Sequence, residues 1–198
     1  MTREQVINKV KARIDELEPF SDVELNPSID VTSNIVDDSA NSFALSIPSS
    51  LLSPESFAGS THVRYTEEGI GKVDLPADYL KLHSFKMLTW ERDVTNSITP
   101  ADPKYKLQSN AITRGGVSKP TVVVKNGYLW YYSLPIGVEG VIEEALYIKK
   151  QDATTIPDNL IIPYVWYCAA EVLQIMGEER LSGMAREKVH ESILSLTT

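Results

Sequence analysis

Apolar residues recur at helical spacing along the N-terminal part of the chain, with charged residues between them. A stripe over residues 3–18 predicts an amphipathic helix that Pro19 ends. A second stripe from about residue 34 to Pro48 predicts another helix, and the polar residues 20–34 before it are typical of turns. The first stripe consists of Val6, Val10, Ile14 and Leu17, and the second of Val36, Ala40, Phe43, Ala44 and Ile47.

The C-terminal part of the chain predicts two antiparallel helices. Nearly every position over residues 159–176 is apolar, so we expect that helix to be buried on all sides. Gly177 suits its end because glycine adopts a positive φ without strain. A second helix over residues 178–196 follows after a short join, which makes the two helices neighbours. Its apolar residues are spaced by four: Leu181, Ala185, Val189 and Ile193.

Residues 119–135 predict a β-hairpin with large apolar groups on both faces. Asn126-Gly127 tolerates the positive φ angles of a two-residue type I′ turn, and this turn sets the register. A small domain easily covers only one face of an antiparallel sheet, so such a hairpin lies within a sandwich or awaits a partner. The expected pairs are Lys125–Tyr128, Val123–Trp130 and Thr121–Tyr132 on one face, and Val124–Leu129 and Val122–Tyr131 on the other.

Shorter patterns fill the rest of the middle region. Residues 62–65 and 71–74 flank Gly69 as two strands would, and residues 141–149 predict a further strand. Alternating apolar positions over residues 79–90 favour a strand that continues through residues 91–94. Tyr105 to Asn110 predicts one helical turn, and Arg114-Gly115-Gly116 a loop.

Together these patterns predict an α+β fold with an antiparallel β-module between helical ends. We expect one domain over residues 1–198, with a helical part at 1–58, a β-module at 60–150 that contains a hairpin at 120–133, and a helical hairpin at 157–198.

Composition narrows the class of protein. At 198 residues and 42% hydrophobic, the chain can bury a core, and no apolar run approaches the length of a membrane span. The N-terminus lacks the apolar region of a signal peptide, and the single Cys168 favours folding in a reducing compartment. The net charge is −8, of which residues 1–70, with 12 acidic and 5 basic residues, carry −7. A protein that grips DNA needs a basic footprint, and none is visible.

No constellation of residues suggests catalysis. His62, His83 and His190 lie far apart and lack metal-ligand spacing, and Cys168 falls within an apolar helix. Phosphate-binding and nucleophile-elbow motifs are absent from the sequence. The adjacent acids Glu143-Glu144 and Glu178-Glu179 are read as structural. We therefore expect no enzyme, no cofactor and no metal.

The aromatic run Trp130, Tyr131 and Tyr132 leaves several interpretations open. Core packing is the simplest. A protein–protein interface is the next, because Trp and Tyr are enriched at contact centres. A carbohydrate platform or a base-stacking surface would also use exposed rings.

The order of elements resembles the head-to-tail adaptor proteins (connector ring or tail accessory proteins) of short-tailed bacteriophages, in particular the ring proteins of crAss-like phages. The segments that carry the resemblance are KVDLPADYLKLHSFKMLTWERDV, YKLQSN, RGGVSKPTVVVKNGYLWYYSLP and IPDNLIIPYVWYCAAEVLQIMGEE. The resemblance implies a virion protein of the neck or tail that folds in the host cytoplasm and forms a homo-oligomeric ring, usually of twelve subunits. It also implies contacts with the portal protein and with neighbouring tail rings, and a channel through which DNA passes without sequence-specific binding. Several adaptors dock on the portal through a C-terminal tail, whereas this chain ends at Thr197-Thr198 directly after its last helix, so we expect the N-terminal or β region to serve instead.

We expect the subunit interface to involve Val123, Trp130, Tyr132 and Trp166. Some carboxylates of residues 1–70 are expected to face the channel or solvent, where they would repel DNA phosphates. The alternatives are another ring of the same tail, a stopper or a terminator, and a glycan-binding tail module.

Overall fold

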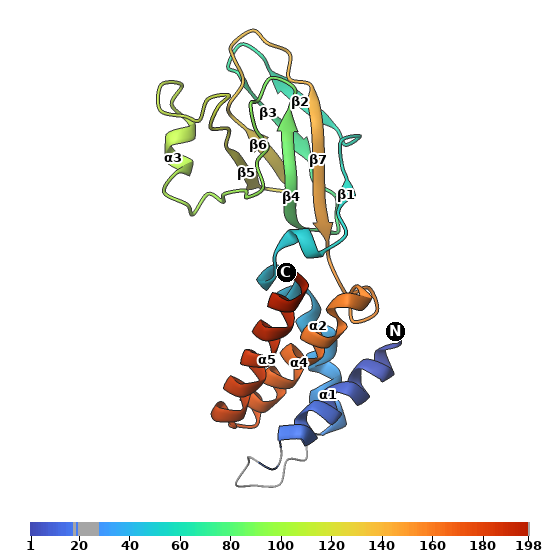
Figure 1. The fold of residues 1–198 in the computed structure, drawn as a ribbon. Coiled ribbons are helices and arrows are strands. Elements are labelled where there is room, and N and C mark those ends of the chain that lie inside the picture. Colours follow the sequence, from blue (N-terminus) through green and yellow to red (C-terminus); the bar gives the residue numbers. More distant parts are fainter. Residues whose placement is uncertain (18, 20–27, 198) are drawn as a thin grey trace. The chain divides into compact units, whose positions relative to one another are not determined.

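The computed structural model describes residues 1–17, 19 and 28–197, and the order of its elements confirms the α+β class (Figure 1). The chain divides into two compact units. The helical unit comprises Met1–Leu52 and Lys150–Thr198, and the β unit comprises Ser53–Lys149. The β unit is thus an insertion between two helical parts. The expectation of a single domain over residues 1–198 stays a prediction.

The helical unit is built around α4 (Ile161–Ile175), which contacts the other three long helices (Figure 1). The Tyr164 hydroxyl on α4 donates a hydrogen bond to the Val36 carbonyl, and its ring lies 5.3 Å from that of Phe43. Within the described part of the chain, no helix is both long and apolar enough to cross a membrane. The other helices are α1 (Arg3–Leu17), α2 (Ile29–Ser46) and α5 (Glu179–Thr197), with 3-10 turns at Ser49–Leu51 and Asp158–Leu160.

The two N-terminal stripes form helices, but the second helix begins earlier than predicted. All members of both stripes are buried. The expectation of turns through residue 34 is wrong for residues 29–34, because α2 begins at Ile29; residues 20–27 of that segment lie outside the described residues. Ser28 is the N-cap: its side chain accepts a hydrogen bond from the Val31 backbone N–H, 3.2 Å away. This cap outweighs the low helix propensity of the β-branched residues that follow.

The apolar helix α4 is buried on most of its surface but not on all of it. Ile162 and Ile175 remain 54% and 60% exposed, which corrects the expectation of burial on every side. The predicted end at Gly177 is confirmed. Gly177 has a φ of 83°, and the Glu178 and Gly177 N–H groups donate to the carbonyls of Leu173 and Gln174. These two bonds form a Schellman motif, which turns the chain into α5.

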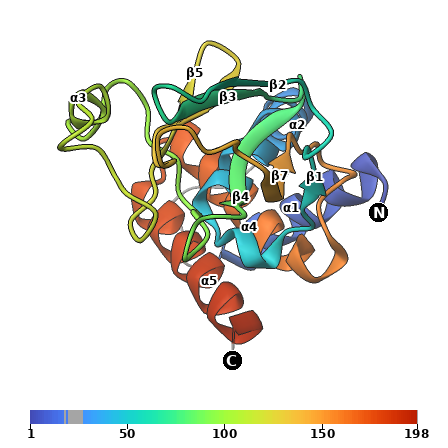
Figure 2. The same ribbon diagram turned by 90° about the horizontal axis from the view of Figure 1, so that it is seen from above.

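The β unit contains two antiparallel sheets that share one core. The strand order is β1–β7–β4 in the first sheet and β2–β3–β6–β5 in the second. The segment that carries the short α3 (Tyr105–Gln108) lies to one side of the strands, next to β5 (Figures 1 and 2). The strands are β1 (Glu55–Ser56), β2 (His62–Tyr65), β3 (Ile70–Asp74), β4 (Tyr79–Met87), β5 (Val122–Lys125), β6 (Tyr128–Tyr131) and β7 (Ile142–Lys149).

Aromatic rings fill the space between the two sheets. Phe85 of β4 is fully buried, and its ring contacts those of Phe57, Trp90 and Tyr131 at centroid distances of 6.2, 5.7 and 6.3 Å. Tyr131 comes from the opposite sheet, so this cluster joins the two layers. Sheet-on-sheet packing of this kind buries one face of each sheet.

The hairpin has the predicted turn and register. Asn126 and Gly127 have φ angles of 53° and 76°, as a type I′ turn requires. Val123 pairs with Trp130, and Lys125 with Tyr128. The expected pair of Thr121 and Tyr132 lies outside the ladder, because the Thr121 N–H donates to the Ser133 hydroxyl, 3.1 Å away.

The strand predicted to continue through residues 91–94 ends at Met87 instead. The chain turns back, and Val94 forms an isolated antiparallel bridge with Phe85. Trp90 stabilises this turn: it is buried, and its indole N–H donates to the Ser133 carbonyl at 3.0 Å. Burial of one large ring thus overrides the alternating pattern of the sequence.

A half-buried histidine makes the stability of the β unit depend on pH. His62 Nε2 lies 2.6 Å from the Tyr131 hydroxyl, and burial, with Arg64 nearby, lowers the pKa of His62 against a weaker opposing effect of Glu139. Since the folded-state pKa is the lower one, the unfolded chain takes up the proton first. We expect the free energy of unfolding to fall as the pH drops below about 6.5, the pKa of histidine in an unfolded chain.

Urea denaturation at a series of pH values checks this expectation. His62→Gln should lose part of the decrease between about pH 7 and pH 5, a window set by the ordinary histidine pKa. His190→Gln, at an exposed histidine, is the matched control and should keep it. An unchanged pH profile in His62→Gln would contradict the assignment.

Candidate interaction site

One face of the β2–β3–β6–β5 sheet carries aromatic rings and a lysine that the rest of the chain leaves partly uncovered. We call Tyr65, Lys72, Tyr128 and Trp130 the aromatic–lysine face. The Lys72 ammonium lies 4.0 Å from the centroid of the Tyr128 ring and 5.5 Å from that of Trp130. The Tyr65 and Trp130 rings are parallel within 1° at 6.3 Å. Cation–π attraction therefore holds the lysine over the two rings.

Strand pairing explains why these residues meet. Lys72 and Trp130 are direct partners across β3 and β6, and Tyr128 lies two residues from Trp130 on the same face. Tyr131 and Leu129 point the opposite way, into the core, where both are fully buried. The hairpin therefore uses one apolar face for its own core and leaves part of the other at the surface.

The α3 segment covers the β5 end of this same face. The Lys125 ammonium donates a hydrogen bond to the Tyr105 hydroxyl of α3, 2.9 Å away. Burial, with Tyr105 beside it, raises the pKa of Tyr132 to about 12. Tyr132 is therefore neutral at physiological pH, and its hydroxyl is able to donate and accept hydrogen bonds.

Between the α3 segment and the sheet lies a pocket of about 290 Å³, which we call the Arg114 pocket. Its wall is held by Gln108, which is buried: the side chain donates to the Lys104 carbonyl and accepts from the Gly115 N–H. The loop predicted at Arg114-Gly115-Gly116 is present, and the Gln108 bond anchors it where Arg114 lines the pocket. The pocket is lined by Glu68, Ile70, Gln108, Ser109, Arg114, Lys125, Trp130 and Tyr132.

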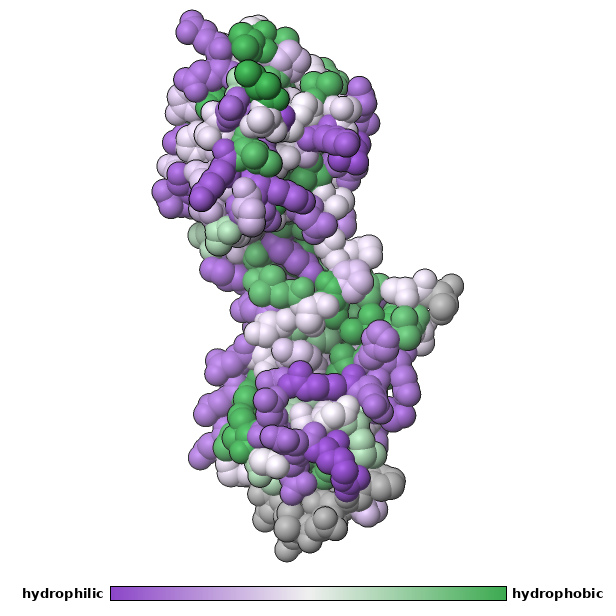
Figure 3. Space-filling view, turned by 90° about the vertical axis from the view of Figure 1, so that its left-hand side faces the viewer, coloured by the Kyte–Doolittle hydropathy of each residue, from purple (hydrophilic) through white to green (hydrophobic). Residues whose placement is uncertain are grey.

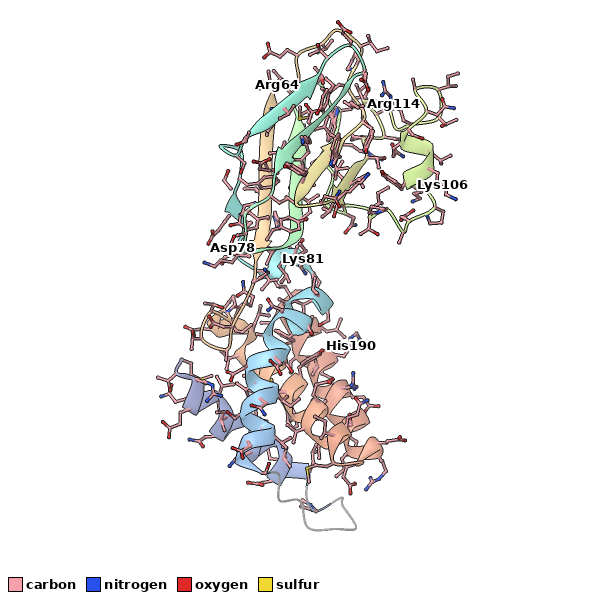
Figure 4. The ribbon with its side chains drawn as sticks, turned by 180° about the vertical axis from the view of Figure 1, so that it is seen from behind. Arg64, Asp78, Lys81, Lys106, Arg114 and His190 are labelled. Carbon is pink, nitrogen blue, oxygen red and sulfur yellow. The ribbon has the colours of Figure 1, made fainter. Side chains whose placement is uncertain are left out.

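Two cations and one acid line the Arg114 pocket. Figure 4 shows Arg114 beside the sheet, with Lys106 on the neighbouring α3 segment. Among the residues that the structure describes, the Arg114 guanidinium has no hydrogen-bond acceptor or ion-pair partner. Lys125 bonds only to a neutral phenol within the same part of the chain. The pocket therefore presents net positive charge next to an indole ring.

The four residues expected at the subunit interface fall into two groups. Trp130 and Tyr132 are half-buried and line the Arg114 pocket, so both retain surface for a partner. Val123 is fully buried in the β unit. Trp166 is 7% exposed in the helical unit, where the Arg13 guanidinium lies 5.2 Å from its ring. Val123 and Trp166 are buried within their own units, so of these four residues Trp130 and Tyr132 retain surface for a subunit interface. That these two rings contact another subunit stays a prediction.

The helical unit presents a separate apolar strip on the second half of α5. Leu194 and Leu196 are 51% and 36% exposed, and Val189 and Ile193 are half-buried. The buried residues of α5 that the structure describes, Leu181, Ser182 and Ala185, all lie in the first half of the helix. Figure 3 shows hydrophobic residues lying among hydrophilic ones on one side of both units. The chain thus has two chemically different surfaces with uncovered apolar area.

The net charge of the chain comes from the helical unit. The helical unit has 16 acidic and 8 basic residues, which gives −8, whereas the β unit has 11 of each and is neutral. All nine acidic residues of residues 1–70 that the structure describes are exposed, in line with the expectation that these carboxylates face solvent. Whether they face a channel stays a prediction.

The described residues hold no group of three or more His, Cys, Asp or Glu side chains that could bind a metal ion. Cys168 is fully buried in α4, and burial raises the pKa of its thiol to about 12. A neutral, enclosed thiol is a poor nucleophile.

This burial predicts that Cys168 reacts only when the helical unit opens. We expect a thiol reagent to modify the native protein at least about a hundredfold more slowly than the urea-unfolded chain, since reaction requires both exposure and a thiolate. Absorbance of the released chromophore from a disulfide reagent measures both rates. Fast labelling of the native protein would contradict the buried placement.

A scan against models of protein families found no match to the chain, and no curated protein matches it either.

Proposed function

We propose that this chain is a structural subunit of a bacteriophage virion, a connector ring protein that joins the portal to the tail and extends the DNA channel. The observation that carries the proposal is the aromatic–lysine face: the folded sheet leaves Tyr65 38% exposed, and it leaves Trp130 half-buried at the Arg114 pocket. Rings of this kind are typical of the centre of a protein–protein contact.

Ring assembly places a particular demand on each subunit, and two further features support it. A head-to-tail contact joins two different patches, and it gives a ring when the rotation closes. The aromatic–lysine face on the β unit and the apolar strip on α5 are two such patches. The acidic helical unit adds exposed carboxylates, which would repel DNA phosphates in a channel rather than bind them.

The proposed role is not catalytic. Among the residues that the structure describes, a buried thiol, tyrosines with raised pKa values and scattered histidines do not combine into a nucleophile with a base. Within the same virion, a second ring of the tail, a stopper or a terminator, would use the same two patches, and only the partner would differ.

The direct test is the mass and symmetry of the purified protein, alone and mixed with the portal protein of the same virus. We expect closed rings, usually twelvefold, in negative-stain images, and a stoichiometric complex with the portal in light scattering. Contact with a tail component in place of the portal would favour a lower ring. A protein that stays monomeric and does not bind the portal would refute the proposal.

The parallel rings of Tyr65 and Trp130 favour a second candidate, a glycan-binding tail module. Flat, exposed aromatic surface suits the apolar face of a sugar. Trp130→Ala separates the two functions. Loss of sugar binding with normal assembly would support a glycan-binding module, and loss of assembly would support a connector ring protein.

A further inference from the structure

The Arg114 pocket has the chemistry of a receptor for a carboxylate, and the chain itself supplies a matching surface. An arginine beside a ring, with no acceptor among the described residues, is suited to bind a carboxylate with two parallel hydrogen bonds. Trp130, Tyr132 and Ile70 also line the pocket and give it apolar surface. A group that combines a carboxylate with a neighbouring apolar side chain would satisfy both parts.

The pocket is pre-formed rather than created by a partner. The Gln108 side chain accepts a hydrogen bond from the Gly115 N–H of the loop and donates one to the Lys104 carbonyl at the start of α3. The Arg114 backbone N–H donates to the Asn110 carbonyl at 2.9 Å. At Gly69 a Cβ atom would lie 3.1 Å from the Arg114 guanidinium and 2.4 Å from the Leu134 carbonyl oxygen, so this glycine lets the arginine approach the sheet. A loop whose backbone is already anchored loses little freedom when an anion binds.

Charge decides which anion fits best. Glu68 also lines the pocket, so a phosphate with two negative charges is less favourable there than a single carboxylate. The helical unit, at −8, would repel nucleic acid at long range. The same unit of another copy, in contrast, would be drawn toward the cations of the pocket.

We propose that the Arg114 pocket receives a carboxylate-bearing segment of the helical unit of a second copy of this chain. The contact joins the neutral β unit of one copy to the acidic helical unit of the next, so it is head-to-tail and can close into a ring. The inference rests on the proposed self-association and names the surface that mediates it.

Self-association of the full-length protein tests whether the Arg114 pocket mediates the contact between copies. It is measured by sedimentation velocity and by assembly on the portal. We expect Arg114→Glu to weaken association at least about tenfold, because it places a like charge opposite the incoming carboxylate. Arg92→Glu makes the same change of charge at an exposed site in the β unit outside the pocket, and it should alter association less than about twofold. Wild-type association should also weaken between about 50 mM and about 500 mM salt.

Circular dichroism first establishes that each variant is folded. Arg114→Gln, which removes the charge but keeps a polar side chain, replaces Arg114→Glu if the latter unfolds. If Arg114→Glu or Arg114→Gln forms rings as well as the wild-type protein does, the assignment of the pocket as the contact is refuted and the proposed ring function remains. A wild-type protein that never associates would overturn both.

A different ligand of the Arg114 pocket, nucleic acid, would be detected by a separate titration. Tryptophan fluorescence titrated with a single-stranded oligonucleotide reports nucleic acid at the pocket. Saturable quenching that Arg114→Gln abolishes, with unchanged self-association, would assign the pocket to nucleic acid and refute the proposal.

Discussion

Replacing Phe85 with alanine is expected to lower the free energy of unfolding of the β unit by about 3–5 kcal/mol. Phe85 is fully buried and contacts aromatic rings from both sheets, Phe57 and Trp90 on its own side and Tyr131 across the sandwich. Loss of the ring removes its transfer free energy and leaves a cavity among rigid neighbours that cannot close around it.

The measurement is urea denaturation followed by tryptophan fluorescence. Trp166→Phe provides the background, so that only Trp90 and Trp130, both in the β unit, report. Leu107→Ala is the control, because Leu107 lies in the same unit and is 48% exposed; its effect should stay within about 0.5 kcal/mol. A loss below about 1 kcal/mol for Phe85→Ala would mean that the two sheets do not share this core.

Gly71→Ala is expected to destabilise the β unit by about 3 kcal/mol, at the upper end of overpacking effects. A Cβ atom at this position would lie 2.0 Å from the Tyr131 hydroxyl oxygen and 2.8 Å from the Val63 carbonyl oxygen. The second neighbour is backbone of the paired strand β2, so the strand itself has to shift. Gly71 is therefore needed for close approach of the Tyr131 side chain to β3.

A double-mutant cycle with Tyr131→Leu identifies the cause. In that background Gly71→Ala should cost at least about 1 kcal/mol less, because the clash with the phenol ring is gone. Gly183→Ala is the matched control: a Cβ there meets nothing within 4 Å, and in the exposed surface of α5 alanine should stabilise by about 0.5–1 kcal/mol. Equal costs in both backgrounds would assign the effect to the backbone alone.

Sequence patterns found most elements because these depend on local rules. The α1 stripe, the Schellman end at Gly177 and the Asn126-Gly127 turn each follow from spacing or from a positive φ. The errors in the bounds of two elements have identifiable causes. The start of α2 depends on a single capping bond from Ser28, and the end of β4 on the burial of Trp90 against Ser133.

The candidate site was only partly predictable. Trp130 and Tyr132 stood out in the sequence as large rings on one face of the hairpin. Lys72 and Tyr65 did not, because they come close to Trp130 only through the pairing of β3 with β6. No short turn joins these two strands, so the sequence does not specify that pairing. Arg114 lay in a short glycine-containing loop with no motif, and only the buried Gln108 fixes it next to the sheet.

The amino-acid sequence by itself determined the helical faces, the hairpin turn and the hairpin register, since backbone sterics and period-two alternation act over a few residues. It could not determine which face of that hairpin is core, because both faces are apolar and the alternation fits either choice equally well. The tertiary structure decided it: packing against Phe85 places Tyr131 inside, and Trp130 is left beside Lys72 and the Arg114 pocket. Contacts between distant segments, which local patterns cannot specify, therefore created the surface to which we assign the function.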